Sequence, residues 1–274
     1  MKVFISADIE GITGIVDAEL QTGTAGRDYE KARRLMTQDA NAAIGGAFDA
    51  GASEVVVSDG HGGSSMRNLL LEELDPRAEA VVGSPKPLTQ MEGVDSTFGL
   101  AMLVGYHARM GSEGILSHTI SGGAVANVWI NDVLVGETGI NSLLAGAFGV
   151  PVGLVTGDQC VTAEAKALMP WVDTVIVKHA ITRYAARCLS PAKTRELIHG
   201  AAVEAVRAAS QGKYKPLVFP APLTYKLQLI NSGLADKAAR MGEERIDPTT
   251  FKIVGECPVD CFKRMRALIG LAQG

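Results

Sequence analysis

The chain has 274 residues, of which 47% are hydrophobic and 20% charged, and its formal net charge is −4. This composition is typical of a folded globular protein large enough for one large domain or two smaller ones, and it excludes a disordered chain. No cluster of Lys and Arg is available to neutralise phosphates, which argues against a nucleic-acid partner.

The sequence contains neither a membrane span nor a secretory signal by its apolar pattern. No apolar run reaches the roughly 18 to 20 residues that a span requires. Asp8 interrupts the N-terminal apolar stretch before the core of a signal peptide could form. Four cysteines lack metal-binding spacing, and we expect them to be free thiols of a cytoplasmic protein. They are Cys160, Cys188, Cys257 and Cys261.

Short β-branched runs alternate with segments of helical period in the first two thirds of the chain. This pattern predicts βαβ units and a largely parallel sheet. A helix is predicted over residues 29–49, where apolar side chains recur every three or four positions and Gly51 follows. Asn131-Asp132 is a two-residue turn candidate, so residues 125–136 predict a β-hairpin, followed by a helix over 138–148. The other predicted strands are 3–6, 54–58, 78–82, 100–106, 152–156 and 174–177.

The last third of the chain has a different character. A long amphipathic helix is predicted from Pro191 to Ser210, with Ser190 as its N-cap. A stretch rich in Pro, Gly and Lys follows, and beyond it we predict strand 224–230, helix 234–241, strand 251–254 and helix 259–271. We therefore expect an α/β domain over residues 1–212 and a smaller C-terminal α+β subdomain over 213–274 packed on it.

Histidine and carboxylate side chains directly follow four of the predicted strands. Because ligands of an open parallel sheet bind beyond the carboxyl ends of the strands, we expect these side chains to meet in one place. Neighbouring glycines permit tight turns and a close approach of the backbone to an ion, whereas no phosphate-binding GxxxxGK[ST] loop is present. The residues are Asp8, Glu10, Asp59, His61, His107 and Glu137.

This set of side chains predicts a metal site at the carboxyl ends of the strands. Imidazoles and carboxylates without a thiol favour Zn²⁺, Mn²⁺ or Co²⁺. Five ligands exceed the four of a single tetrahedral zinc, so we expect two ions about 3.5–4 Å apart that share one carboxylate. Such a pair activates water for attack on a carbonyl, which indicates a hydrolase. The expected ligands are Asp8, Glu10, His61, His107 and Glu137.

The remaining polar candidates have alternative interpretations. Asp59 either caps the turn after its strand or orients His61 as a hydrogen-bond partner. His179 and His199 are expected to be structural. His118 lies in a polar, Gly-rich loop, where it could serve as a general acid or base or could simply be a solvated loop histidine.

Six short motifs, in this order along most of the chain, resemble one known family. They are SADIEG at residues 6–11, SDGH at 58–61, GYHA at 105–108, SH at 117–118, ND at 131–132 with GE at 136–137, and CLSPAK at 188–193. The set resembles the D-aminopeptidase family of dinuclear zinc peptidases, whose best-known members are encoded in bacterial dipeptide-transport operons.

The resemblance implies a specific site, substrate and assembly. Asp8, Glu10, His61, His107 and Glu137 would hold two zinc ions per subunit, with Asp8 bridging them. His118 matches the catalytic position, described in the family as a nucleophile. We favour general acid/base catalysis or oxyanion stabilisation by His118, because the metals already activate water. The family further implies a cytoplasmic homodecamer of two stacked pentameric rings that removes N-terminal D-residues such as D-Ala from short peptides and amides.

Two other functions stay open at this point. Preference for D-residues rests on the resemblance alone, because no spacing in the sequence encodes chirality. A metal-dependent L-peptidase, or an amidohydrolase of another small metabolite, would use the same site. A non-catalytic metal- or peptide-binding protein linked to dipeptide uptake would bind without turnover.

Overall fold

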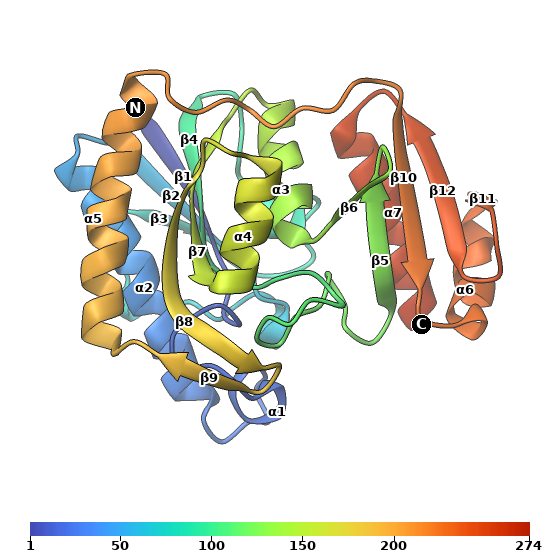
Figure 1. The fold of residues 1–274 in the computed structure, drawn as a ribbon, viewed down its shortest axis with the longest axis horizontal. Coiled ribbons are helices and arrows are strands. Elements are labelled where there is room, and N and C mark those ends of the chain that lie inside the picture. Colours follow the sequence, from blue (N-terminus) through green and yellow to red (C-terminus); the bar gives the residue numbers. More distant parts are fainter.

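A seven-stranded sheet forms the larger part of the computed structural model, which describes residues 1–274 (Figure 1). Its strands are β1 (Lys2–Ala7), β2 (Glu54–Asp59), β3 (Glu79–Val81), β4 (Phe98–Tyr106), β7 (Val152–Asp158), β8 (Asp173–Thr182) and β9 (Ala185–Cys188). The order across the sheet is β3-β2-β1-β4-β7-β8-β9, and only β9 pairs antiparallel with its neighbour. The mostly parallel α/β sheet predicted from the sequence is confirmed.

Helices cover both faces of this sheet (Figure 1). On one face lie α2 (Tyr29–Asp49) and α5 (Pro191–Ser210), and on the other lie α3 (Glu137–Ala147) and α4 (Gln159–Leu168). Alternate residues of each strand point to opposite faces. Val3 and Ile5 therefore join the core under α2 and α5, whereas Phe4 joins the core on the α3 side.

A second, five-stranded antiparallel sheet packs on the side of α3 (Figure 1). Its order is β11-β12-β10-β5-β6, and α6 (Ser232–Ala238) and α7 (Pro258–Gln273) cover it. The predicted hairpin is present, with Asn131 and Asp132 both at positive φ, as a type I′ turn requires. The strands are β5 (Val125–Ile130), β6 (Val133–Val135), β10 (Leu223–Leu229), β11 (Glu244–Arg245) and β12 (Thr250–Gly255).

This sheet combines strands from two distant parts of the chain. β5 pairs with β10, so the hairpin of residues 125–135 lies in the same sheet as strands beyond residue 212. The smaller α+β part predicted at the C-terminus is present, and it includes this hairpin. A boundary between residues 212 and 213 stays a prediction about independent units.

Most predicted elements agree with the observed ones to within a few residues. Helix α5 begins at Pro191 as expected, and its N-cap Ser190 accepts a hydrogen bond from the Lys193 amide. Helix α4 was not predicted. Its N-cap, Asp158, accepts hydrogen bonds from the amides of Cys160 and Val161. Also unpredicted were β9, β11, helix α1 (Ala18–Gln21) and three 3₁₀ turns, η1 (Gly63–Ser65), η2 (Leu71–Glu73) and η3 (Thr89–Met91). The predicted helix 234–241 is present as α6 and the 3₁₀ turn η4 (Ala239–Met241) that continues it. None of the helices has both the length and the apolar character needed to cross a membrane.

Helices α2 and α5 pack through a glycine. A Cβ added at Gly46 would lie 2.9 Å from the Ala202 Cβ and still closer to the carbonyl oxygen of His199, so the two helices approach as only glycine allows. Gly200, by contrast, is exposed on α5 and an added Cβ would contact nothing within 4 Å.

This contrast predicts opposite effects of two identical substitutions. Gly46→Ala should lower the free energy of unfolding by about 3 kcal/mol through overpacking. Gly200→Ala should raise it by about 0.5–1 kcal/mol, because alanine loses less conformational entropy in a helix. Chemical denaturation of both variants measures the difference, and a stable Gly46→Ala protein would show that the helices do not pack this closely.

Candidate metal centre

Six side chains with metal-ligating atoms meet beyond the carboxyl ends of β1, β2 and β4. Strand β1 lies between the other two. After β1 the chain adds β2 and β3 on one side, and it then adds β4 on the other side of β1, so the strand order reverses there. Open α/β sheets place their ligand crevice at such a reversal. The six form two groups of three, and within each group the ligating atoms lie within 4.8 Å of one another. The groups are Asp8, Glu10 and His61, and His107, His118 and Glu137.

The first group is built from the loop after β1, which carries Asp8 and Glu10, and from His61, the second residue after β2. His61 Nδ1 lies 3.3 Å from Asp8 Oδ1 and 3.1 Å from Glu10 Oε2. Its other ring nitrogen, Nε2, donates a hydrogen bond to the Thr22 carbonyl oxygen at 2.6 Å. Because that carbonyl can only accept, Nε2 carries a proton and Nδ1 is the nitrogen that an ion would bind after displacing its proton.

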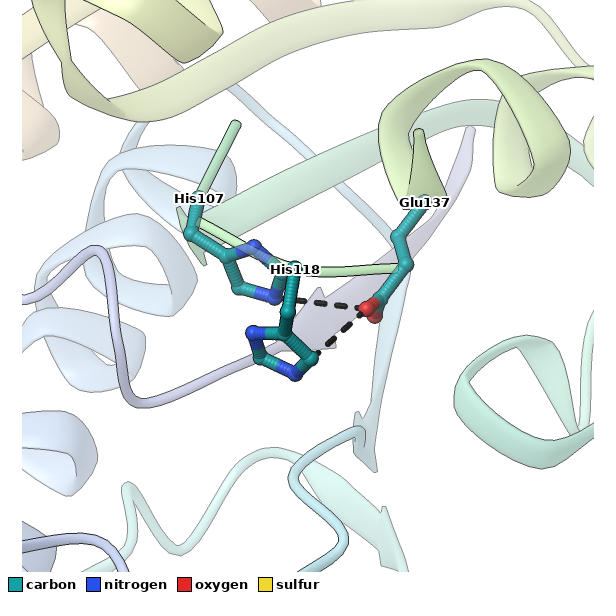
Figure 2. Close-up of side chains that lie close together, drawn as sticks. All are labelled: His107, His118 and Glu137. Carbon is teal, nitrogen blue, oxygen red and sulfur yellow. Dashed lines mark ion pairs between the residues drawn. The ribbon is translucent and has the colours of Figure 1, made fainter. Parts of the chain in front are cut away.

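The second group follows β4 and begins α3. His107 Nε2 lies 3.3 Å from Glu137 Oε1, and its Nδ1 is hydrogen-bonded to the Ala108 carbonyl at 3.0 Å. The His118 ring stacks on that of His107 with centroids 4.0 Å apart and planes inclined by 11°. Its Nε2 lies 3.8 Å from Glu137 Oε1, so both rings face the same carboxylate, as Figure 2 shows. In each ring the nitrogen that faces Glu137 is the one left available to an ion, because a main-chain carbonyl accepts a hydrogen bond from the other.

Asp8 joins the two groups. Its Oδ1 faces His61, and its Oδ2 lies 3.7 Å from His107 Nε2. Neither Glu10 nor Glu137 contacts an imidazole of both groups. Asp8 therefore has the geometry of a carboxylate shared between two adjacent ions.

The donor atoms are arranged for binding metal ions, because two of them are buried without a hydrogen-bond partner in the protein. Asp8, Glu10, His61, His107 and Glu137 are all buried. Glu10 Oε2 and His107 Nε2 lie near opposite charges yet make no hydrogen bond, which is uncommon for buried polar atoms. Atoms arranged in this way point towards a common centre, and oxygen and imidazole nitrogen suit zinc.

The pKa values show how strongly the carboxylates attract cations. Burial raises the pKa of Asp8 to about 7, and the charge of Glu10 adds to this. Burial alone would lower the pKa of His107, but Glu137 raises it to about 10. Without an ion, protons on the imidazoles thus balance the carboxylates, and a divalent cation would displace those protons. His118 differs, because burial and the charge of His107 lower its pKa.

A hydrogen-bonded network that the sequence did not indicate holds the carboxylates. Gln90 donates to Glu137 Oε2 at 2.6 Å and more weakly to Asp8 Oδ2 at 3.3 Å. Asn141 fixes Gln90 by donating to its Oε1 at 2.6 Å, and also donates to the Tyr106 hydroxyl. Gln90 lies in the short turn η3, far from every motif and outside any periodic pattern.

A buried lysine holds the loop that carries Asp8 and Glu10. Lys178 donates hydrogen bonds to the carbonyl oxygens of Glu10, Ile12 and Ile15 at 2.5, 2.9 and 2.6 Å. The loop also rests on β4, where Gly105 has φ +74° and leaves no room for a side chain beside the Asp8 carbonyl. Lysine and glycine together hold the ligands of this loop in place.

Three other polar candidates lie outside the two groups. Asp59 accepts hydrogen bonds from the Asn68 and Leu69 amides and from the Asn68 side chain, which in turn donates to the His61 carbonyl. It thus positions the main chain around His61 and does not contact the imidazole ring. His199 is half-exposed and pairs with Asp49 at 2.9 Å, and His179 also lies away from the site. His118 is not a solvated loop residue, because its side chain is only 20% exposed.

Five of the six side chains, all except His107, line a cavity of about 150 Å³ that is partly open to solvent. A cavity of this size with an open side suits a small ligand, such as a metabolite or a short peptide. Its other lining side chains include Met66, Thr89, Gln90, Ile120 and Arg266. Arg266 comes from α7 of the smaller sheet and was not expected from the sequence.

The chain is similar to known D-aminopeptidases over nearly its whole length. A family profile described as D-aminopeptidase, peptidase M55, matches residues 1–267. A D-aminopeptidase from Bacillus subtilis (strain 168) is 38% identical over 275 residues, which cover 100% of this chain and 98% of the relative. A solved structure, described as the Zn-dependent D-aminopeptidase DppA from Bacillus subtilis, a self-compartmentalizing protease, superposes with a TM-score of 0.94 at 38% identity. This superposition covers 100% of the present chain and 98% of the chain in the solved structure.

The geometry predicts two divalent ions per chain, with Asp8 needed for both. Asp8→Asn should therefore lower the bound metal from two ions per chain towards none, whereas Glu10→Gln should weaken mainly one. Binding should weaken as the pH falls, because protons compete for the same imidazole nitrogens. Elemental analysis after equilibration with zinc measures the stoichiometry, with the exposed Asp132→Asn as control. Two ions retained by Asp8→Asn would contradict a shared carboxylate.

Proposed function

Because the chain belongs to the peptidase M55 family of D-aminopeptidases, we propose that it releases N-terminal D-amino acids such as D-alanine from short peptides and amides. The reaction is hydrolysis of the first peptide or amide bond, next to a free α-amino group. A small cavity of about 150 Å³, partly open to solvent and lined by buried acidic groups, supports a short substrate with a cationic end.

We further propose that the enzyme works with two zinc ions. The position of Asp8 supports a pair of ions, because its two carboxylate oxygens face one imidazole in each group of ligands. One ion would be held by Asp8, Glu10 and His61, and the other by Asp8, His107 and Glu137. The zinc dependence of the similar Bacillus subtilis enzyme supports the choice of metal, as does the absence of thiols from the donor set.

When bound, such a pair of ions polarises the substrate carbonyl and activates water for attack. The chain's own side chains orient the reactants and move protons. Gln90 keeps the carboxylates of Asp8 and Glu137 in place through its amide. His118 lies at the cavity with Nδ1 bound to the Leu116 carbonyl, so its Nε2 is the atom that exchanges a proton with the substrate. Because its pKa is lowered, His118 is neutral at rest, and we assign Nε2 the task of taking a proton from the attacking water and passing it to the departing amine.

The assembly and location belong to the same proposal. The similar enzyme is described as a self-compartmentalizing protease, which supports a closed homo-oligomer for this chain. On the resemblance of the motifs we propose a cytoplasmic decamer of two pentameric rings. Size-exclusion chromatography with light scattering measures the mass, and a monomer would contradict the ring assembly.

Hydrolysis of D-Ala-p-nitroanilide and its L-isomer tests the activity and its chirality together. We expect cleavage of the D-isomer alone, loss of cleavage after chelation, and recovery when zinc is returned. Equal turnover of both isomers would identify a peptidase or amidase without the D-preference. Stoichiometric binding with no product, in a zinc-loaded protein, would instead identify a binding protein.

Replacing His118 separates catalysis from metal binding. His118→Ala should lower kcat by about 10²-fold or more, as loss of a positioned acid or base does, while both ions remain bound. His199→Ala, which removes a remote histidine, should leave kcat unchanged. Loss of one ion from His118→Ala would mean that this side chain is a ligand alongside His107 and Glu137, with which it forms one group.

A further inference from the structure

Arg266 stands apart from the other arginines of the chain. It lines the cavity from α7, and its side chain makes no hydrogen bond and no ion pair within the protein. Its Nε is buried without a partner. The other arginines without such a contact, Arg187 and Arg240, lie exposed at the surface. A half-buried, unpaired guanidinium is costly to maintain, which indicates a partner outside the chain.

The charges around the cavity indicate what that partner is. Arg266 is the only Lys or Arg among the residues that line it, and all three acidic ligands lie at the same cavity. None of these carboxylates comes within ion-pair distance of Arg266, and any metal ions would neutralise them. The guanidinium therefore remains available to an anionic group of the ligand itself.

A short peptide supplies such a group. Its α-amino end is positive and its C-terminal carboxylate is negative, which matches a cavity lined by three carboxylates and one arginine. The planar guanidinium pairs with a carboxylate through two parallel N–H bonds. In a dipeptide the carboxylate belongs to the residue whose amide bond is cleaved, so the two charged ends lie on residues with Cα atoms only about 3.8 Å apart. Both ends can therefore reach groups that line the same small, partly open cavity.

We propose that Arg266 binds the C-terminal carboxylate of the substrate and so makes the enzyme selective for very short peptides with a free carboxyl end, dipeptides above all. This inference rests on the proposed function, since it concerns the substrate of the same site. Selectivity then comes from the smaller sheet, whose helix α7 carries Arg266, while the ligands come from the larger sheet and α3.

The test compares D-Ala-D-Ala with its C-terminal amide, D-Ala-D-Ala-NH₂, in which the bond to be cleaved is the same. The wild-type enzyme should favour the free acid by about 10- to 100-fold in kcat/KM, mostly through KM, which is the range for one charged hydrogen-bonded contact. Arg266→Gln should abolish that preference and leave the amide nearly unaffected. Arg266→Lys, which keeps the charge but loses the fork, should restore part of it.

Lys263→Gln is the matched control, because it removes an exposed charge from the same helix. It should keep the full preference for the free acid. Zinc content and the unfolding midpoint of each variant report whether the site and fold are intact. A wild-type enzyme without preference, or an Arg266→Gln variant slowed equally on both compounds, would overturn the proposal.

Failure of the proposed function would look different. If the zinc-loaded wild type cleaves neither compound, the assigned activity is wrong, and calorimetric titration with the same two compounds still tests Arg266. Binding that favours the acid and is lost in Arg266→Gln would support the carboxylate contact. Equal affinity of the wild type for the acid and the amide would overturn it.

Discussion

The Asp8 carboxylate lies between two imidazoles, and the remainder of the site is arranged around that contact. Asp8 can occupy this position because the end of β1 lies directly against β4, where its amide donates to the Val104 carbonyl at 2.8 Å. Gly11 and Gly105 allow this close approach, since a side chain at either would collide with the neighbouring backbone. The metal centre thus depends on the pairing of two central strands and on two residues that lack a side chain.

Holding this many ionisable groups away from water lowers the stability of the fold unless each is satisfied. Thr22, Ala108 and Leu116 satisfy one nitrogen of each imidazole with a main-chain carbonyl. Gln90 and Lys178 fix the carboxylates and their loop. What remains unsatisfied is the set of atoms directed at the centre, including Glu10 Oε2 and His107 Nε2. This division between satisfied and unsatisfied atoms is what two bound ions would complete.

Local patterns in the sequence predicted most of the larger sheet, its two longest helices and the convergence of histidine and carboxylate residues. These features follow from periodicity and from the rule that strand ends meet at one edge. Contacts between distant segments were not predictable in this way. The pairing of β5 with β10 joins strands almost a hundred residues apart, and no turn encodes it. Gln90 and Arg266 reach the cavity from η3 and α7, and only the folded chain places them beside the ligands.

Anomalous diffraction from zinc-loaded crystals tests most directly whether Asp8 lies between two metal ions. We expect two peaks per chain, about 3.5–4 Å apart, with one Asp8 oxygen about 2.0–2.2 Å from each. One peak should lie beside His61 and Glu10 and the other beside His107 and Glu137. A single peak, or two peaks of which only one contacts Asp8, would contradict the account.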